Sequence, residues 1–91
     1  MNEFGDLVVY PNPVRPDYQG NIALKGMMNN SEVKIIDASG NHIKTIFSNG
    51  GQAVWDGLDK NNQLVGSGVY YFLATSEDGY SKAKSKILVI R

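Results

Sequence analysis

The fold is decided by residues 55–73, which read Trp55-Asp56-Gly57-Leu58-Asp59-Lys60-Asn61-Asn62-Gln63-Leu64-Val65-Gly66-Ser67-Gly68-Val69-Tyr70-Tyr71-Phe72-Leu73. A polar loop here joins the only tryptophan to the densest apolar run in the chain. The β-branched and aromatic residues at 69–72, which follow two glycines, predict a strand that enters a core. Trp55 offers the largest apolar surface, so we expect the core to form around it together with Tyr71 and Leu73.

On both sides of this stretch, short apolar segments alternate with turn signals. The turns read Ser39-Gly40-Asn41, Asn49-Gly50-Gly51 and Glu77-Asp78-Gly79, which are typical of hairpins. Strands are expected at 7–10, 21–25, 31–37, 42–47, 52–55, 68–75 and 80–90. No segment keeps a 3.6-residue period, so the pattern predicts an all-β fold, an immunoglobulin-like antiparallel β-sandwich of about seven strands.

Two prolines interrupt the chain directly after the first expected strand, at Pro11-Asn12-Pro13. Each removes a backbone donor, and each forces extended or turn geometry on the residue before it. The strand must therefore leave its sheet or switch sheets at this point.

Size and charge restrict the range of functions. The 91 residues suffice for one domain, which we place at 7–91, with residues 1–6 as the end of a linker. Nine basic and nine acidic side chains cancel, so no global field attracts nucleic acid or an anionic membrane. Cysteine is absent, which excludes disulfides and thiolate metal sites. No apolar run is long enough to span a bilayer, and residues 1–20 lack the pattern of a signal peptide.

No residue offers reaction chemistry, and we expect no catalytic residue, cofactor or metal site. His42 has no local partner for a nucleophile and base pair, so a solvated histidine on an edge strand is favoured. Asp56 and Asp59 lie near Asn61 and Asn62, a set of oxygen ligands with a faint likeness to a calcium loop. The spacing lacks the distal glutamate of such a loop, and turns closed by Asp and Asn side chains explain it better.

Two surface features have a structural and a functional interpretation. Lys82, Lys84 and Lys86 share one face of the last strand, which suits an anionic surface, but edge lysines more often prevent aggregation. The same face continues into Leu88 and Ile90, so either the register shifts or the strand end is covered on both faces. Tyr70 and Phe72 point away from Val69, Tyr71 and Leu73, so one of the two aromatic sets can lie outside. An exposed pair could stack on sugars, although core and cross-strand packing is favoured.

Five segments in order resemble the C-terminal sorting domain of the type IX secretion system in Bacteroidetes. They read Val9-Tyr10-Pro11-Asn12-Pro13-Val14, Val33-Lys34-Ile35-Ile36-Asp37-Ala38-Ser39-Gly40, Trp55-Asp56-Gly57, Gly68-Val69-Tyr70-Tyr71 and Lys86-Ile87-Leu88-Val89-Ile90-Arg91. The resemblance covers nearly the whole chain. The second half also resembles the immunoglobulin-like domain of the flagellar hook-capping protein. Asn62 stands where the family commonly has glycine, and asparagine tolerates the left-handed conformation best among the other residues.

The resemblance implies an exported, non-catalytic signal that directs a larger cargo across the outer membrane to the cell surface or the medium. Its partners would be the outer-membrane translocon and a sortase-like peptidase, which often cleaves the domain off upstream of the first strand. Carried over by resemblance, the recognised residues are Tyr10, Pro11, Asn12, Pro13, Gly40, Gly68, Val69, Tyr70, Lys86, Ile87, Leu88 and Val89. We expect the free outer edge of Lys86–Arg91 to pair with the translocon.

Two other functions stay open. In the first, the domain is retained permanently in a propeller-bearing surface protein of the secretion machinery and binds lipopolysaccharide. In the second, it is a spacer or carbohydrate-binding module of a secreted enzyme, which would use Tyr70 or Phe72. Neither the identity of the cargo nor the oligomeric state follows from the sequence.

Overall fold

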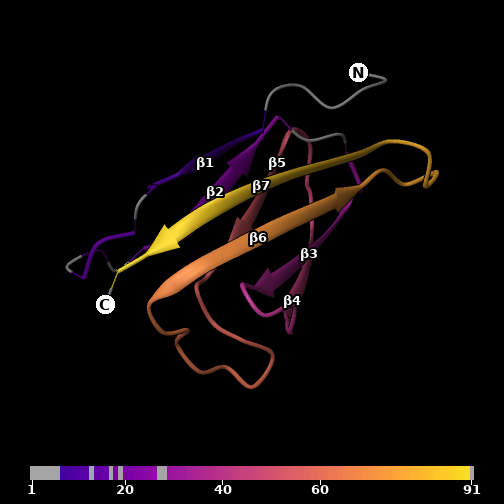
Figure 1. Cartoon of the computed structure of the whole chain (residues 1–91). Helices are drawn as coiled ribbons and strands as arrows, with labels where there is room; N and C mark the ends of the chain where they lie inside the picture. Colours follow the sequence, from indigo (N-terminus) through magenta and orange to yellow (C-terminus); the bar gives the residue numbers. More distant parts are fainter. Residues whose placement is uncertain (1–6, 13, 17, 19, 27–28, 91) are drawn as a thin grey trace.

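Seven strands form two antiparallel sheets in a computed structural model that describes residues 7–12, 14–16, 18, 20–26 and 29–90. The strands are β1 (Val8–Tyr10), β2 (Ile22–Lys25), β3 (Glu32–Asp37), β4 (His42–Phe47), β5 (Gln52–Trp55), β6 (Gly68–Thr75) and β7 (Lys82–Val89). One sheet has the order β1-β2-β5 and the other β4-β3-β6-β7 (Figure 1). The predicted all-β sandwich of seven strands is confirmed. The expected linker at 1–6 lies outside the described residues.

Alternation along each strand turns one set of side chains toward the space between the sheets. Trp55 fills the centre, with 1% of its surface exposed, and the rings of Tyr70 and Phe72 each lie 5.8 Å from it, centroid to centroid. Tilted and edge-on ring contacts of this kind stabilise the core beyond what burial of the rings contributes. The other buried apolar residues are Val9, Val14, Ile22, Leu24, Val33, Ile35, Ala53, Val65, Ala74, Ile87 and Val89.

One part of the predicted core is wrong. Tyr71 and Leu73 lie on the outer face of β6, 36% and 38% exposed, whereas Tyr70 and Phe72 are 7% and 1% exposed. Val69 through Leu73 is apolar throughout, so the sequence does not show which alternate set points inward. Pairing across the sheet decides it, because Phe72 is opposite the fully buried Ile35.

The long loop between β5 and β6 extends below the two sheets (Figure 1). Short-range hydrogen bonds hold it. The Trp55 indole N–H donates to the carbonyl of Leu58 at 2.9 Å. Asp59 Oδ1 accepts from the amides of Asn61 and Gln63 at 2.8 and 3.0 Å. Asn62 has a φ of 61°, the left-handed conformation predicted for it. Turns closed by Asp side chains therefore explain the acidic cluster, as expected.

Candidate functional site: the β7 edge and its lysine face

The chain switches sheets after β1, as the two prolines predict. β1 pairs with β2 in the three-stranded sheet, and the Tyr10–Pro11 peptide bond that follows it is cis. Val14 then forms a parallel bridge with Val89 at the edge of the other sheet. The segment after β1 therefore lies beside the second half of β7.

Four hydrogen bonds cover this half of the β7 edge. The amide of Leu88 donates to Asn12 Oδ1 at 3.2 Å, and Asn12 Nδ2 donates to the carbonyl of Lys86 at 3.3 Å. The amide of Val14 donates to the carbonyl of Leu88 at 2.8 Å, and the amide of Ile90 donates to the carbonyl of Val14 at 2.7 Å. The Asn12 side chain thus acts like a short piece of neighbouring strand. We call Asn12 and Val14 the edge cap.

The edge cap corrects the expected docking strand. The prediction that the outer edge of Lys86–Arg91 is free for pairing is wrong for most of residues 86–90, because the Lys86 carbonyl, both backbone groups of Leu88 and the Ile90 amide are bonded to the cap. Arg91 and Pro13 lie outside the described residues. The β6–β7 register runs without a shift from Gly68 opposite Val89 to Thr75 opposite Lys82, and Leu88 remains 43% exposed. The strand end therefore shows neither of the two expected alternatives, a register shift or cover on both faces.

The first half of β7 differs from the second. In an antiparallel strand, alternate residues direct both backbone groups to the same side. The backbone groups of Leu88 point away from β6, so those of Lys82 and Lys84 do as well. On that side they have no bond to another described residue. Their side chains are exposed. In the part of the chain that the structure describes, this half of the edge is open.

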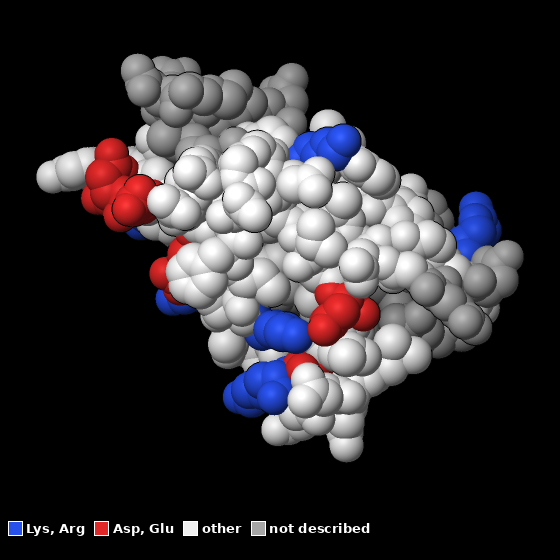
Figure 2. Space-filling view, turned by 180° about the vertical axis from the view of Figure 1, so that it is seen from behind, with Lys and Arg blue, Asp and Glu red and all other residues white. Residues whose placement is uncertain are grey.

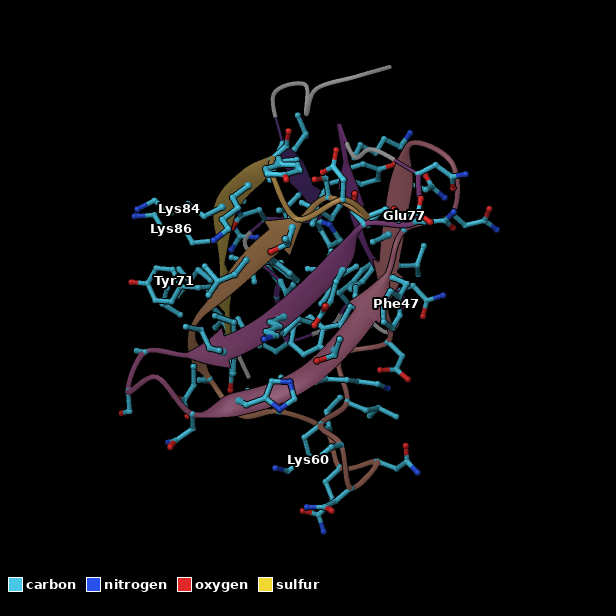
Figure 3. All side chains as sticks on the ribbon, turned by 90° about the vertical axis from the view of Figure 1, so that its right-hand side faces the viewer. Phe47, Lys60, Tyr71, Glu77, Lys84 and Lys86 are labelled. Atoms are coloured by element: carbon cyan, nitrogen blue, oxygen red, sulfur yellow. The ribbon has the colours of Figure 1, made fainter. Side chains whose placement is uncertain are left out.

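The outer face of the four-stranded sheet carries positive charge beside apolar side chains. Lys34, Leu73 and Lys84 are neighbours in one cross-strand row, and Ile36, Tyr71 and Lys86 form the next. Figure 3 shows Lys84, Lys86 and Tyr71 extending to the same side of the molecule. Among the described residues of this face the one carboxylate is Glu32, whose Oε1 lies 3.9 Å from Lys34 Nζ. We call Lys34, Lys82, Lys84 and Lys86 the lysine face.

Charges are distributed differently on the opposite side. Figure 2, seen from behind, shows basic and acidic side chains next to one another on a largely uncharged surface. Lys44 Nζ, for example, lies 3.3 Å from Asp56 Oδ2 and joins β4 to the loop after β5. A chain without net charge therefore has one face that is distinctly basic.

The residues carried over by resemblance fall into three groups. Asn12 and Lys86–Val89 come together at the capped edge, and Gly68, Val69 and Tyr70 pair with Val89, Leu88 and Ile87. Tyr10 lies on the neighbouring sheet, 43% exposed, with Lys25 Nζ 5.3 Å from its ring centroid, and Pro11 is half-buried. Gly40 lies apart, in the turn between β3 and β4, with a φ of 88°.

Several of these residues act in folding. Ile87 and Val89 are 0% and 1% exposed, and Tyr70 is buried with its hydroxyl donating to the carbonyl of Gly66 at 2.8 Å. A partner cannot touch such side chains in the folded domain. The predicted packing of Tyr70 and Phe72 in the core is confirmed, so stacking of sugars on either ring is excluded in this structure.

The remaining titratable groups form no reaction centre in the described part of the chain. No group of three or more His, Cys, Asp or Glu side chains is placed to hold a metal ion there. His42 is exposed on the edge strand β4, with Nε2 2.8 Å from Thr45 Oγ1. Asp37 and Asp78 have a pKa below the ordinary value: the first through hydrogen bonds from Asn41, the second through one from the Ser76 hydroxyl. Both carboxylates close turns.

A hollow lined by Val14, Tyr18, Ile22, Asp56 and Leu64 lies between the loop after β1 and the loop after β5. Asp56, the carboxylate among its described lining residues, is already paired with Lys44. Within the described ranges, no helical segment has the length and apolar character to cross a bilayer.

Sequence reasoning missed the edge cap and the contribution of Lys34. The prolines indicated a change of sheet but not its destination. A signal for Lys34 was present in the alternation of β3, which places it opposite Leu73.

Residues 16–79 match the model of the FlgD Ig-like domain. No curated protein matches the sequence significantly. Among solved structures, the chain is similar to PorZ of Porphyromonas gingivalis, described as an essential bacterial surface component of the type IX secretion system. The TM-score is 0.84 at 28% identity, over 94% of this chain and 12% of that one.

Proposed function

This chain belongs to the family of FlgD Ig-like domains, and from that premise we propose that it is a type IX sorting domain. In this proposal it is a non-catalytic module that directs a larger cargo across the outer membrane of a member of the Bacteroidetes. Its partners are the translocon and the sortase-like peptidase. The observation that carries the proposal is the likeness of nearly the whole chain to one small part of PorZ, a surface component of this system.

The domain architecture supports this role. The part of PorZ that this chain matches is 12% of that protein, which supports a role as one domain of a larger protein. In this proposal the module carries out no reaction and works by being bound. The second half of β7 and the edge cap keep the module folded, and the lysine face is the surface beside them that a partner can reach.

Fusion to a reporter tests the proposal. The chain is attached to the C-terminus of a periplasmic fluorescent protein in a bacterium with a working type IX system, and cells are fractionated. We expect fluorescence at the surface or in the medium, and periplasmic retention in a strain without the translocon. Equal periplasmic retention in both strains refutes the proposal.

Deletion of residues 85–91 is a poor test of recognition. It removes Ile87 and Val89 from the core, so the domain would unfold and export would fail for that reason. Substitutions on the lysine face are better, because they leave the core unchanged.

A second function is favoured by the nature of the structural neighbour, which is itself a surface component. In this alternative the domain stays attached to a propeller-bearing surface protein and contacts lipopolysaccharide. Mass spectrometry of the mature protein distinguishes the two. C-terminal peptides of the domain recovered on the full-length surface protein support retention, and their loss from exported cargo supports a cleaved sorting domain.

A further inference from the structure

The open part of the β7 edge and the lysine face coincide at two residues. Lys82 and Lys84 direct their backbone groups outward from the sheet, and their side chains lie on its outer face. An incoming strand meets both features at once: the backbone groups position it, and the lysines select its side chains. The edge cap ends this opening at Lys86, whose carbonyl is bonded to Asn12.

Lysines on an open edge reject most strands. They repel a second copy of the same edge, and they disfavour an apolar strand, which leaves the ammonium groups without a partner. A strand with carboxylates directly opposite the lysines avoids both penalties, because opposite charges in facing positions stabilise a strand pair. The lysines therefore discriminate among strands and do not simply block them.

The spacing of the charges specifies the form of the ligand. Same-face residues on a strand are roughly 6.7 Å apart, so Lys82, Lys84 and Lys86 form a row and not a cluster. An extended peptide with an acidic residue at every second position has the same repeat. On the β6 side of this row, Leu73 and Thr75 line a hollow with Lys34, Lys82 and Lys84.

We propose that the first half of β7 binds an extended acidic segment of a partner protein, with carboxylates at alternate positions facing Lys82 and Lys84. The inference rests on the proposed function and names the partner chemistry at the same strand. The segment adds as a further strand beside the first half of β7, which the edge cap does not cover.

A phosphate-bearing ligand fits the same face less well. A single phosphate group is best held by donors that converge on it, and arginine provides the bidentate geometry. Here the donors are exposed lysines in a row, and the described strands of this face contain no arginine. An anionic membrane is therefore an outcome for the test to exclude.

Binding is measured by NMR on the full 15N-labelled chain with three acetylated nonapeptides. They are an alternating Thr-Glu peptide, a block peptide of the same composition, and an alternating Thr-Lys peptide. We expect the alternating Thr-Glu peptide to shift the amides of Lys82 to Lys84, more weakly at higher salt. The block peptide and the Thr-Lys peptide are expected to bind much more weakly.

Charge substitutions sharpen the test. Lys82→Gln/Lys84→Gln should weaken binding of the alternating Thr-Glu peptide by about 2- to 30-fold, the range for two facing ion pairs. The matched control Lys25→Gln/Lys60→Gln removes the same charge elsewhere and should leave binding unchanged. Lys82→Glu/Lys84→Glu should transfer the preference to the Thr-Lys peptide. Thermal unfolding of each variant verifies that it is folded.

Three results overturn the inference. The first is equal binding of the block and alternating peptides, which indicates charge attraction without strand pairing. The second is a set of shifts away from residues 82–84. The third is a stronger response of the same amides to vesicles of phosphatidylcholine with phosphatidylglycerol, which assigns the face to a membrane.

Export of the reporter fusion separates this inference from the proposed function. If the unsubstituted fusion is not exported, the sorting role fails, whatever the peptides do. If it is exported and the Lys82→Gln/Lys84→Gln fusion is exported equally well, the sorting role stands and the acidic partner of this strand is refuted.

Discussion

The two halves of β7 differ, although they belong to one continuous strand. Between Lys86 and Val89 the inward side chains are buried and the outer edge is bonded to Asn12 and Val14. Between Lys82 and Ser85 the inward side chains are small and half-buried, and the outward backbone groups have no bond to the described residues. One half maintains the fold, and the other is available to a partner.

The largest loss in the free energy of unfolding should come from substitution of a core residue of β7. Ile87→Ala removes a fully buried side chain and should lower the free energy of unfolding by about 2–5 kcal/mol, measured by chemical denaturation. The neighbouring Leu88→Ala, on the exposed outer face, should lower it by about 1 kcal/mol or less. Equal losses at the two positions would remove the distinction between the faces of β7.

The edge cap should contribute less than the core. Asn12→Ala removes both side-chain hydrogen bonds to β7 and should lower the free energy of unfolding by about 1 kcal/mol. Asn61→Ala is a matched control in an exposed loop, where we expect a change within about 0.5 kcal/mol. If the two variants unfold at the same denaturant concentration, the cap does not stabilise the strand.

The lysine face should contribute least to the fold. Lys82→Gln/Lys84→Gln changes exposed side chains away from the core and should alter the free energy of unfolding by about 0.5 kcal/mol or less. A small increase in stability is equally consistent, because like charges on adjacent same-face positions repel. A loss comparable with that of Ile87→Ala would show that the lysines are structural.

Acid titration tests the hairpin that leads into the open half. The Ser76 hydroxyl and the Tyr80 amide donate to Asp78 and hold its pKa below the ordinary value. A lowered folded-state pKa means that this stabilisation is present above about pH 3.9 and is lost as the pH falls through the folded-state pKa. Carboxyl NMR should show that Ser76→Ala raises the pKa of Asp78 and leaves that of Asp37 unchanged. An unaltered Asp78 titration would contradict the assignment.

Much of the fold could be predicted because its determinants are local. Hairpin signals such as Ser39-Gly40-Asn41 and the alternation of β2, β3 and β5 each depend on a few neighbouring residues. Which side chains of β6 point into the core could not be predicted, because five consecutive apolar residues give no alternation. Pairing with β3, more than thirty positions away in the chain, decides it.

The candidate site was less predictable for the same physical reason. The row of lysines on β7 is visible in the sequence, since strand alternation suffices to find it. The edge cap is not visible, because Asn12 and Lys86 are 74 positions apart and their contact exists only after both sheets have formed. The expected free edge of β7 was therefore wrong where the edge cap, distant in the sequence, covers it.

Native-state hydrogen exchange along β7 tests the central claim most directly. The amides of Leu88 and Ile90, which donate to Asn12 and Val14, should be protected, whereas those of Lys82 and Lys84 should exchange rapidly. Equal protection of all four amides would show that the open half of the edge does not exist in solution, and would contradict this account.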